Sequence, residues 1–378
     1  MKINIGLSDS HLSGKEYKYI KQALDANQVS NYGENISCLE KTLEAFLEKN
    51  YKVACLSSGT GAIHLALILA GVKKDDEVLC QSMTFSASAN PILYLGANPV
   101  FIDSENETWN MCPNYLEEAI EDRIFKSEKP KAIIVVHSYG MPAKISEIVA
   151  VAEKYEIPLI EDTAEALGSS YKGQKCGTFG DFVILSFNGN KIITTSGGGA
   201  LATRDKEIKN KAIFLATQAK ENAPHYQHSE IGYNYRMSNI LAGIGRGQME
   251  VIDKHISLRR SMNIFYKEIF KDVKGVSVFQ EPNTDYFSNH WLSCILIESK
   301  ITGFTRDDLR IELSRKNIES RPLWKPMHLQ PIFKDYPFYG SNVSESLFNN
   351  GLCLPSGSNL TKKEKALIAK TILDYINH

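Results

Sequence analysis

Residues 186–199 read SFNGNKIITTSGGG, and Lys191 lies in their middle, shortly after the apolar run 182–187. The stretch is too polar for a protein core and too structured for a linker. A lysine at the end of a buried strand can act as a Schiff-base nucleophile, because partial desolvation favours the neutral amine. A solvated lysine beside a glycine-rich turn explains the same residues equally well. Neither GxGxxG nor GxxxxGK[ST] occurs here, so the glycines do not indicate a nucleotide-binding loop of those kinds.

Short apolar runs alternate with helical patterns on both sides of this stretch. Strands that are apolar on both faces and alternate with helices are typical of a mostly parallel sheet covered on each side. The sequence therefore predicts an α/β fold for its first three-fifths. The expected strands are 53–56, 77–80, 99–102, 132–136, 158–160 and 182–187, and the expected helices between them include 62–70, 114–124 and 145–155.

The pattern changes after about residue 236. Residues 238–270 have helical periodicity for most of their length, enough to connect two lobes. A strand is expected at 290–297, and helices at 306–316 and 362–376. We therefore predict a large domain over 1–252, including an N-terminal segment, and a smaller α+β domain over 253–378. A ligand crevice is expected between the lobes or at the strand ends.

Composition narrows the class of protein. The 378 residues are 43% hydrophobic and 23% charged, which is ordinary for a packed globular chain of two or three domains. The formal net charge is −1 and there is no basic run, so a nucleic-acid or anionic-membrane binder is not expected. The longest apolar stretches, such as 65–72 and 132–136, are far shorter than the ~20 residues of a membrane-spanning helix.

The seven cysteines are scattered along the chain, and none forms a CxxC pair. A zinc site or a disulfide framework is therefore not expected, and no metal is predicted. The residues from Met1 onward lack the apolar core of a signal peptide. Together these features lead us to expect a protein of the reducing cytoplasm.

Three further stretches place polar or aromatic residues at predicted strand ends. Residues 159–168 read LIEDTAEALG, and a carboxylate such as Asp162 at the end of a parallel strand can pair with a protonated ring nitrogen. Residues 57–62 read SSGTGA, and small residues at a helix start let backbone N–H groups approach an anion. Phe85 follows another strand and could stack on a planar cofactor.

Each of these stretches also has an ordinary structural explanation. Asp162 could begin a helix as its cap, residues 57–62 could form a plain strand-to-helix turn, and Phe85 could belong to the core. Taken together with Lys191, however, they supply an amine nucleophile, an acid for a ring nitrogen, a phosphate cradle and a stacking platform. Pyridoxal phosphate requires these four features, so the sequence predicts a pyridoxal phosphate enzyme.

The chain resembles the DegT/DnrJ/EryC1/StrS sugar aminotransferases over essentially its whole length. The resemblance is carried by residues 58–62, 161–168, 186–191 and 232–239. It implies the pyridoxal phosphate-dependent transferase fold of type I, like that of aspartate aminotransferase. Residues 188–199, 321–328 and 353–357 look most like the aminotransferases of UDP-N-acetylbacillosamine synthesis in bacterial protein glycosylation, and the legionaminic-acid branch is similar.

The resemblance implies a role for each matching residue. Lys191 would hold pyridoxal phosphate and then move the proton between substrate carbon and cofactor. Asp162 would pair with the pyridine nitrogen, and Phe85 would stack on the ring. Glu165 stands near the ring where the family more often has Gln or His, which marks this branch. The expected phosphate ligands are Gly59, Thr60 and Ser186, with Asn234 supplied by the neighbouring subunit of a homodimer.

The same resemblance implies contacts to the substrate, for which structural alternatives stay open. Trp324 and His328 could instead belong to a packed proline-rich turn, and Arg236 could be a structural ion-pair partner. Lys325 and Arg236 are the candidates for attracting a diphosphate to a near-neutral chain. The full expected set is Asn31, Tyr32, Gly33, Asn188, Arg236, Trp324, Lys325 and His328, of which Arg236 would come from the neighbouring subunit.

The implied reaction is a ping-pong transamination from L-glutamate to C4 of a UDP-4-keto-6-deoxy-N-acetylhexosamine. A histidine at position 191 would accompany sugar dehydration in this family, so the lysine favours amine transfer. Two alternatives remain. The acceptor could be another keto-sugar, linked to GDP or dTDP or aminated at C3. The chain could also be a sugar-nucleotide-binding regulatory protein without catalysis, although retention of Lys191 and Asp162 argues against that.

Overall fold

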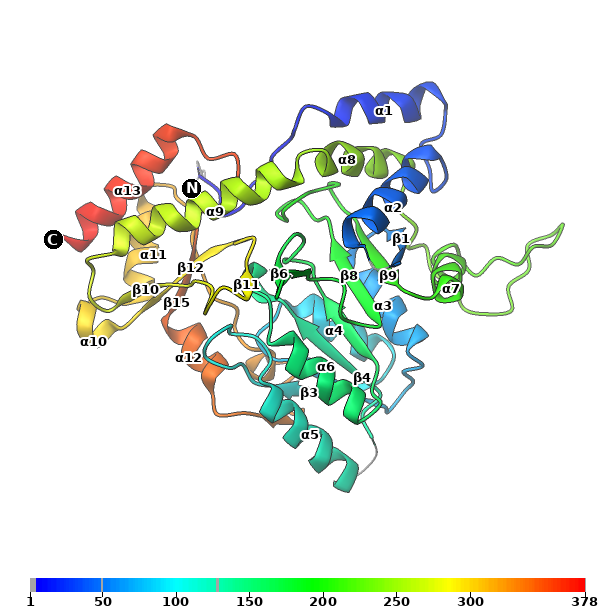
Figure 1. Ribbon diagram of the computed structural model, residues 1–378, viewed down its shortest axis with the longest axis horizontal. Helices are drawn as coiled ribbons and strands as arrows, with labels where there is room; N and C mark the ends of the chain where they lie inside the picture. Colours follow the sequence, from blue (N-terminus) through cyan, green and yellow to red (C-terminus); the bar gives the residue numbers. More distant parts are fainter. Residues whose placement is uncertain (1–4, 49, 127–128, 378) are drawn as a thin grey trace.

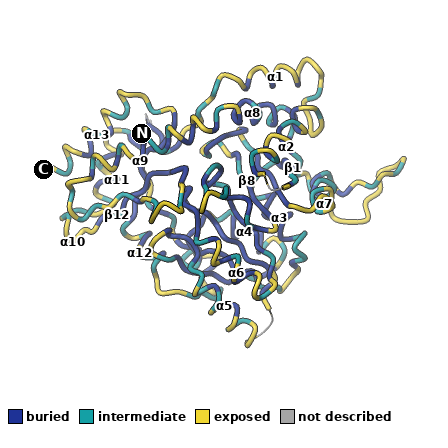
Figure 2. The backbone as a smooth tube through the Cα atoms, in the orientation of Figure 1, coloured by how far each residue is buried: buried dark blue, intermediate teal, exposed yellow. Residues whose placement is uncertain are grey.

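The computed structural model describes residues 5–48, 50–126 and 129–377. It shows a large lobe built on a sheet and a smaller lobe beside it (Figure 1). Helix α9 (Ile252–Phe270) begins against the large lobe and runs along the small one. Most residues in the sheet of the large lobe are buried, whereas exposed residues lie mainly on the outer helices and loops (Figure 2).

The large lobe contains an eight-stranded sheet in the order β1-β9-β8-β5-β4-β2-β3-β14. From β8 to β14 all neighbours pair in parallel, whereas β9 is antiparallel to both β1 and β8. The predicted mostly parallel sheet is therefore confirmed. The strands are β1 (Lys52–Leu56), β2 (Glu77–Gln81), β3 (Asn98–Ile102), β4 (Ala132–Val136), β5 (Leu159–Asp162), β8 (Phe182–Ser186), β9 (Gly199–Thr203) and β14 (Phe338–Tyr339).

Helices cover both faces of this sheet because its strands are apolar on both sides. Along β1, Val53 and Cys55 face one hydrophobic cluster and Ala54 and Leu56 face another. One face packs against α3 (Gly59–Leu69), α4 (Ser86–Tyr94) and α7 (Lys206–Ala216). The other packs against α2 (Glu34–Leu47), α5 (Pro113–Lys126), α6 (Ile145–Lys154) and α8 (Asn239–Met249).

The small lobe has a four-stranded sheet in the order β10-β12-β15-β13, which packs on helices around its own core. Its strands are β10 (Val276–Val278), β12 (Ser293–Ile297), β13 (Arg321–Pro322) and β15 (Gly351–Leu354), and its helices are α9, α10 (Ser299–Thr302), α11 (Arg306–Arg315), α12 (Val343–Asn350) and α13 (Lys362–Ile376). The remaining elements are α1 (Glu16–Asp25), the small sheet of β6 (Ser170–Tyr171), β7 (Gln174–Lys175) and β11 (Tyr286–Phe287), and the 3₁₀ turns Ser138–Gly140 and Met327–Leu329.

Besides strand β9, which is described below, three details differ from the sequence-based expectations. The helical stretch 238–270 is two helices, because α8 ends at Met249 and α9 begins at Ile252. Strand β12 begins at Ser293 rather than 290, since His290 has a left-handed backbone with φ of 47°. Strand β14 comes from the C-terminal part of the chain but pairs with β3 in the large sheet. The division at residue 252 therefore stays a prediction, because the two parts interlock here.

The sequence led us to expect neither a membrane-spanning helix nor a metal site, and the helices and side chains of the structure can be searched for both. Among the described residues, no helix is long and apolar enough to cross a membrane. No group of three or more His, Cys, Asp or Glu side chains within those ranges is placed to hold a metal ion.

Strand β9 was not expected from the sequence, because its first residue belongs to the glycine run 197–199. The structure explains why Gly199 must be glycine: a Cβ there would lie 2.4 Å from the Gly59 backbone nitrogen and 2.7 Å from the Leu185 carbonyl oxygen. Three backbones meet at this point, where β8, β9 and the start of α3 come together. A Cβ added at Gly197 would meet nothing within 4 Å.

We predict that Gly199→Ala lowers the free energy of unfolding by about 1–3 kcal/mol, since the methyl group overpacks this contact. The matched control Gly197→Ala should stay within about 0.5 kcal/mol of the wild type. Urea unfolding of the cofactor-free protein measures both. Equal midpoints for the two variants would contradict the tight backbone contact.

Candidate active site

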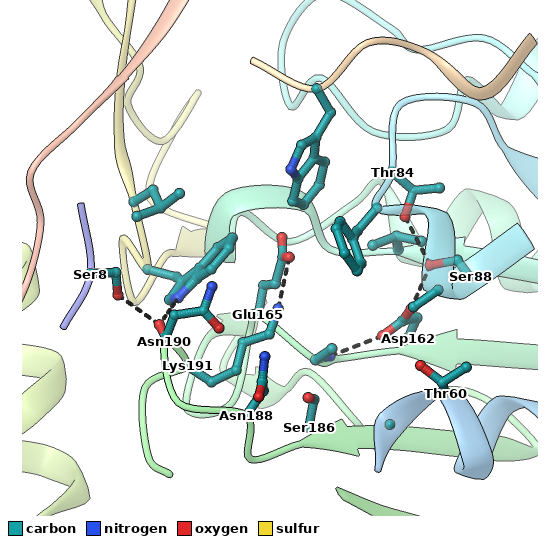
Figure 3. Close-up of a pocket in the computed structure, with 18 of the residues that line it drawn as sticks. Ser8, Thr60, Thr84, Ser88, Asp162, Glu165, Ser186, Asn188, Asn190 and Lys191 are labelled. Carbon is teal, nitrogen blue, oxygen red and sulfur yellow. Dashed lines mark hydrogen bonds and ion pairs between the residues drawn. The ribbon is translucent and has the colours of Figure 1, made fainter. Parts of the chain in front are cut away.

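A cavity of about 870 Å³ opens where the carboxyl ends of the parallel strands meet the small lobe. Segments from both lobes line it, including 57–60, 162–165, 186–191 and 319–325. Figure 3 shows polar side chains from β5, β8 and the loop after β8 pointing toward one another. Of the sequence-predicted site residues, the cavity brings together Gly59, Thr60, Phe85, Asp162, Glu165, Ser186, Asn188, Lys191, Trp324 and Lys325.

Lys191 is held inside this cavity at both ends of its side chain. Its Nζ donates to Glu165 Oε1 at 3.0 Å and lies 4.3 Å from the centre of the Trp291 ring. Its backbone N–H donates to the Asn188 carbonyl at 3.1 Å, which closes the turn after β8. Only 12% of the side chain is exposed. The solvated-lysine alternative is therefore excluded, and the amine is placed for chemistry inside the cavity.

Glu165 connects the lysine to the aromatic wall of the cavity. Its Oε2 accepts the Tyr139 backbone N–H at 2.9 Å, and Tyr139 adopts a left-handed backbone with φ of 58°. The Tyr139 ring stacks on Trp324 at 4.6 Å, and its hydroxyl accepts the Trp324 N–H at 2.9 Å. Burial raises the pKa of Glu165, while the neighbouring Lys191 charge opposes that change. Glu165, which stands where the family more often has Gln or His, thus contacts the lysine directly.

The two acids at the end of β5 have different surroundings, because side chains alternate along a strand. Asp162 lines the cavity, and its Oδ2 and Oδ1 accept hydrogen bonds from Ser88 Oγ at 2.8 Å and the Ala164 N–H at 3.1 Å. Burial raises the pKa of Asp162 despite these bonds. Glu161 is fully buried elsewhere and lacks access to the cavity lining. Of the two adjacent acids, the structure places at the cavity Asp162, the one named from the sequence, and places Glu161 away from it.

Glu161 instead organises the loop before β8. Its carboxylate accepts the N–H groups of Gly177, Phe179 and Gly180 at 2.6–2.9 Å, and His137 Nε2 lies 2.9 Å from Oε1. Burial opposes its ionisation, but the His137 and backbone hydrogen bonds outweigh burial and lower its pKa. This carboxylate is therefore fully engaged in holding the loop between β5 and β8.

The start of α3 offers donors to an anion. Ser58 Oγ accepts the Gly61 N–H at 2.9 Å and so caps the helix. The N–H groups of Gly59 and Thr60 belong to the first turn and have no intrahelical acceptor. Ser186 packs beside them, since a Cβ added at Gly59 would lie 3.1 Å from Ser186 Cβ. These donors and the helix dipole suit a phosphate group.

These residues fit pyridoxal phosphate. The group needs an amine for its aldehyde, a carboxylate for its ring nitrogen and donors for its phosphate. Lys191, the buried Asp162 and the start of α3 provide these around one cavity. Phe85 stands at the edge of the cavity with 57% of its surface exposed, so it is available for stacking.

Six predicted site residues do not line the cavity of the single chain. Arg236 donates to Glu40 Oε1 at 2.6 Å and to the Cys55 carbonyl at 2.9 Å, which favours its structural alternative. His328 stacks on Phe338 at 3.7 Å and lies 2.7 Å from Ser82 Oγ, which favours the packed turn. Outside the cavity lining stand Asn31, Tyr32, Gly33, Asn234, Arg236 and His328.

Three residues of the site were not singled out from the sequence. Ser88 holds Asp162, Tyr139 holds Glu165 and Trp291 lies against Lys191. Ser88 follows Phe85 closely, and Tyr139 follows the strand 132–136 closely, so the strand-end rule could have included both. Trp291 lies in the small lobe, and no local pattern connects it with residue 191.

The model of the DegT/DnrJ/EryC1/StrS aminotransferase family matches residues 11–373 of the chain. The chain belongs to this family. It is 48% identical over 377 residues to the Bacillus subtilis protein EpsN, which is described as a pyridoxal phosphate-dependent aminotransferase, covering 99% of this chain and 96% of EpsN. It is also 37% identical over 366 residues to the GDP-perosamine synthase of Escherichia coli O157:H7, covering 96% of each.

Solved structures agree with this assignment. A family aminotransferase from Brucella abortus has a TM-score of 0.87 at 28% identity, covering 97% of this chain and 96% of its own. The Streptococcus pneumoniae sugar aminotransferase Spr1654, in its PLP form, has a TM-score of 0.89 at 25% identity, covering 100% and 99%. The fold of type I is confirmed, and this family member is a pyridoxal phosphate-dependent sugar aminotransferase.

We predict opposite effects of Asp162→Asn on stability and on activity. Burial raises the pKa of Asp162 above its value in the unfolded chain, so the folded protein loses stability as pH rises through the interval between the two values. The variant removes this loss, so the cofactor-free variant should be more stable than wild type at pH 8 and nearly equal at pH 4. Amine transfer should fall roughly 100-fold or more, since the ring nitrogen loses its charged partner.

Urea unfolding across this pH range and a steady-state assay measure the two effects. Replacing the exposed Asp335 by Asn is the matched control and should change neither. A variant that is less stable than wild type at pH 8 would contradict the unfavourable burial of this carboxylate.

Proposed function

We propose that this enzyme transfers the amino group of L-glutamate to C4 of a UDP-4-keto-6-deoxy-N-acetylhexosamine, giving UDP-4-amino-4,6-dideoxy-N-acetylglucosamine in a ping-pong reaction. The observation that carries the proposal is Lys191 Nζ, held by Glu165 inside a cavity that Asp162 also lines. The choice of sugar rests on the segments that resemble the bacillosamine-pathway enzymes. Parts of those segments, 321–325 and Cys353, lie in the cavity wall, where they could contact a substrate.

The chain's own side chains divide the work of the reaction. Bound pyridoxal phosphate supplies an aldehyde and a ring that accepts electrons. Asp162 keeps a proton at the ring nitrogen, and Lys191 Nζ carries the proton to and from the substrate carbon. Glu165 Oε1 accepts a hydrogen bond from that amine whenever it is free, which keeps it in place. The start of α3 binds the phosphate, so the ring stays oriented between these groups.

The diphosphate of the substrate requires positive charge near the cavity. Lys325 and Arg321 both line the wall that the small lobe contributes. The Arg321 side chain is 66% exposed and pairs with Glu319 at 2.8 Å, so it can reach the solvent side of the cavity. Such local charge attracts an anion although the whole chain is close to neutral.

A homodimer with shared sites is part of the proposal. Asn234 is exposed and lies outside the cavity of its own chain. The segment that follows α7 extends away from the body of the molecule, in green in Figure 1 and largely exposed in Figure 2. Tyr226 and Ile231 on it are each 81% exposed, so a partner packed on this segment would bury apolar surface. A second chain would cover this segment and receive Asn234.

A GDP-linked 4-keto-6-deoxy sugar is the second candidate acceptor. The observation that favours it is the 37% identity to a GDP-perosamine synthase across 96% of both chains. A relative from Geobacillus stearothermophilus, 30% identical, is named a pleiotropic regulatory protein, which keeps a regulatory role as the third candidate. The assembled Lys191, Glu165 and Asp162 favour catalysis over that role.

We predict that glutamate shifts the absorbance of the yellow holoenzyme from the pyridoxal to the pyridoxamine form. A panel of UDP-, GDP- and dTDP-linked keto-sugars, scored by mass spectrometry for amine product, should then give at least about tenfold higher kcat/KM for the UDP-N-acetyl sugar. Lys191→Ala should lose both the long-wavelength band and the product. A preference for the GDP-sugar would support the second candidate, and binding without turnover would support the regulatory role.

We predict that Lys191→Ala and Asn234→Ala are each strongly impaired alone and complement each other when mixed. If Asn234 acts across the dimer, a mixed dimer holds one complete site and one doubly defective site. Random reassembly should then restore about a quarter of the wild-type activity per chain, since half of the dimers are mixed. If mixing and reassembly restore nothing, Asn234 does not act in the partner's site.

A further inference from the structure

Arg259 on α9 is a buried cation without an acidic partner. It is only 1% exposed and is among the largest fully buried side chains of the chain. Within the described ranges, the acceptors of its hydrogen bonds are carbonyl and hydroxyl oxygens, no carboxylate pairs with it, and burial lowers its pKa to about 10. Burying a charge without a counter-charge is strongly unfavourable, so packing alone does not explain an arginine here.

The guanidinium donates to oxygens of four separate segments. Nη1 donates to the carbonyls of Trp291 at 2.6 Å and Ser356 at 3.4 Å. Nη2 donates to Ser8 Oγ at 3.0 Å and to the Lys191 carbonyl at 3.3 Å. The arginine therefore joins the N-terminal segment and two parts of the small lobe to the loop that carries the cavity lysine.

Two of these partners also hold the residue before the lysine. Ser8 Oγ and Trp291 Nε1 both donate to the Asn190 carbonyl, at 2.6 and 2.7 Å. Figure 3 shows Ser8 and Asn190 joined beside Lys191. Ser8 and Trp291 thus hold the Asn190 carbonyl, which precedes the Lys191 N–H, and Arg259 holds the carbonyl of Lys191 itself. The Trp291 ring at 4.3 Å then limits where Nζ can move.

We propose that Arg259 is a positioning residue, which holds the Lys191 backbone so that Nζ meets its reaction partners in a fixed place. A planar guanidinium can serve several carbonyls in set directions, whereas an ammonium on a flexible stem cannot. The helix that carries Arg259 thereby ties the small lobe to the catalytic loop. The inference rests on the proposed role of Lys191 and concerns how that lysine is placed, whichever keto-sugar is the substrate.

The test compares Arg259→Lys with Arg260→Lys, its neighbour on the same helix. Arg260 pairs with Glu281 at 2.6 Å and packs over Phe287, away from the cavity lining, so it is a matched control. Cofactor-free protein is mixed with pyridoxal phosphate, and the long-wavelength absorbance is followed per folded chain. Borohydride trapping and mass spectrometry then locate the label.

Arg259→Lys should slow label formation at Lys191 roughly tenfold or more, because small displacements of a reacting group cost much of its rate. The kcat of the glutamate half-reaction should fall similarly while KM changes less than about threefold, since the ground-state contacts to substrate remain. Arg260→Lys should match the wild type in both. A purely structural arginine would lower the melting temperature and leave these per-chain rates unchanged, which would overturn the proposal.

A second variant applies if Arg259→Lys does not fold. Ser8→Ala keeps Arg259 but removes the Oγ that accepts from its Nη2 and donates to the Asn190 carbonyl, so it should slow label formation about two- to fivefold. An unchanged rate in that variant would overturn the proposal, because the guanidinium would then not place the lysine through this contact. Wild-type protein that takes no label at Lys191 would instead overturn the proposed function, and this inference with it.

Discussion

The ion pair between Lys191 Nζ and Glu165 Oε1, 3.0 Å long inside the cavity, is the interaction on which the rest of the site depends. A buried amine needs a partner, because its charge cannot be left without one in a poorly solvated place. The backbone N–H of Tyr139 holds the other oxygen of Glu165. Tyr139 has a left-handed backbone conformation, and its ring stacks on Trp324. Contacts through Glu165 and Tyr139 thus connect the lysine to the cavity wall that the small lobe contributes.

The sheet brings this pair close to the other cofactor ligands. Parallel strands β5 and β8 end at one edge, which puts Asp162 and Ser186 side by side with the loop after β8. Strand β9 then runs antiparallel beside β8. The connection between them, which carries Lys191, therefore stays at that edge of the sheet, whereas a connection to a parallel strand would have to return to the opposite edge. Gly199 lets the backbones of β9 and α3 touch, which brings the first turn of α3 near the same loop.

The sequence predicted much of the large lobe, and for a definite reason. Runs such as 132–136 and 182–187 are apolar on both faces and stand next to clear helical patterns, so both the strand and its parallel setting follow from local composition. Strand β9 was missed, because Gly199 and Ala200 have side chains too small to produce a recognisable strand pattern. The strand forms through backbone pairing with β8 and close backbone contact at Gly199. Helices α8 and α9 read as one because periodicity continues across the break at residues 250–251.

By itself, the sequence determined the α/β class, the family and the lysine, acid, phosphate cradle and aromatic residue at the strand ends, since these depend on local patterns and residue types. Only the tertiary structure decided that Ser88 holds Asp162, that Arg236 pairs with Glu40, and that Arg259 and Trp291 hold the lysine loop. The physical reason is that these choices depend on contacts between segments more than 60 residues apart, such as the bond from the Arg259 guanidinium to the backbone carbonyl of Lys191, 68 residues away. No local pattern carries that information, because packing sets those contacts once the two lobes have come together.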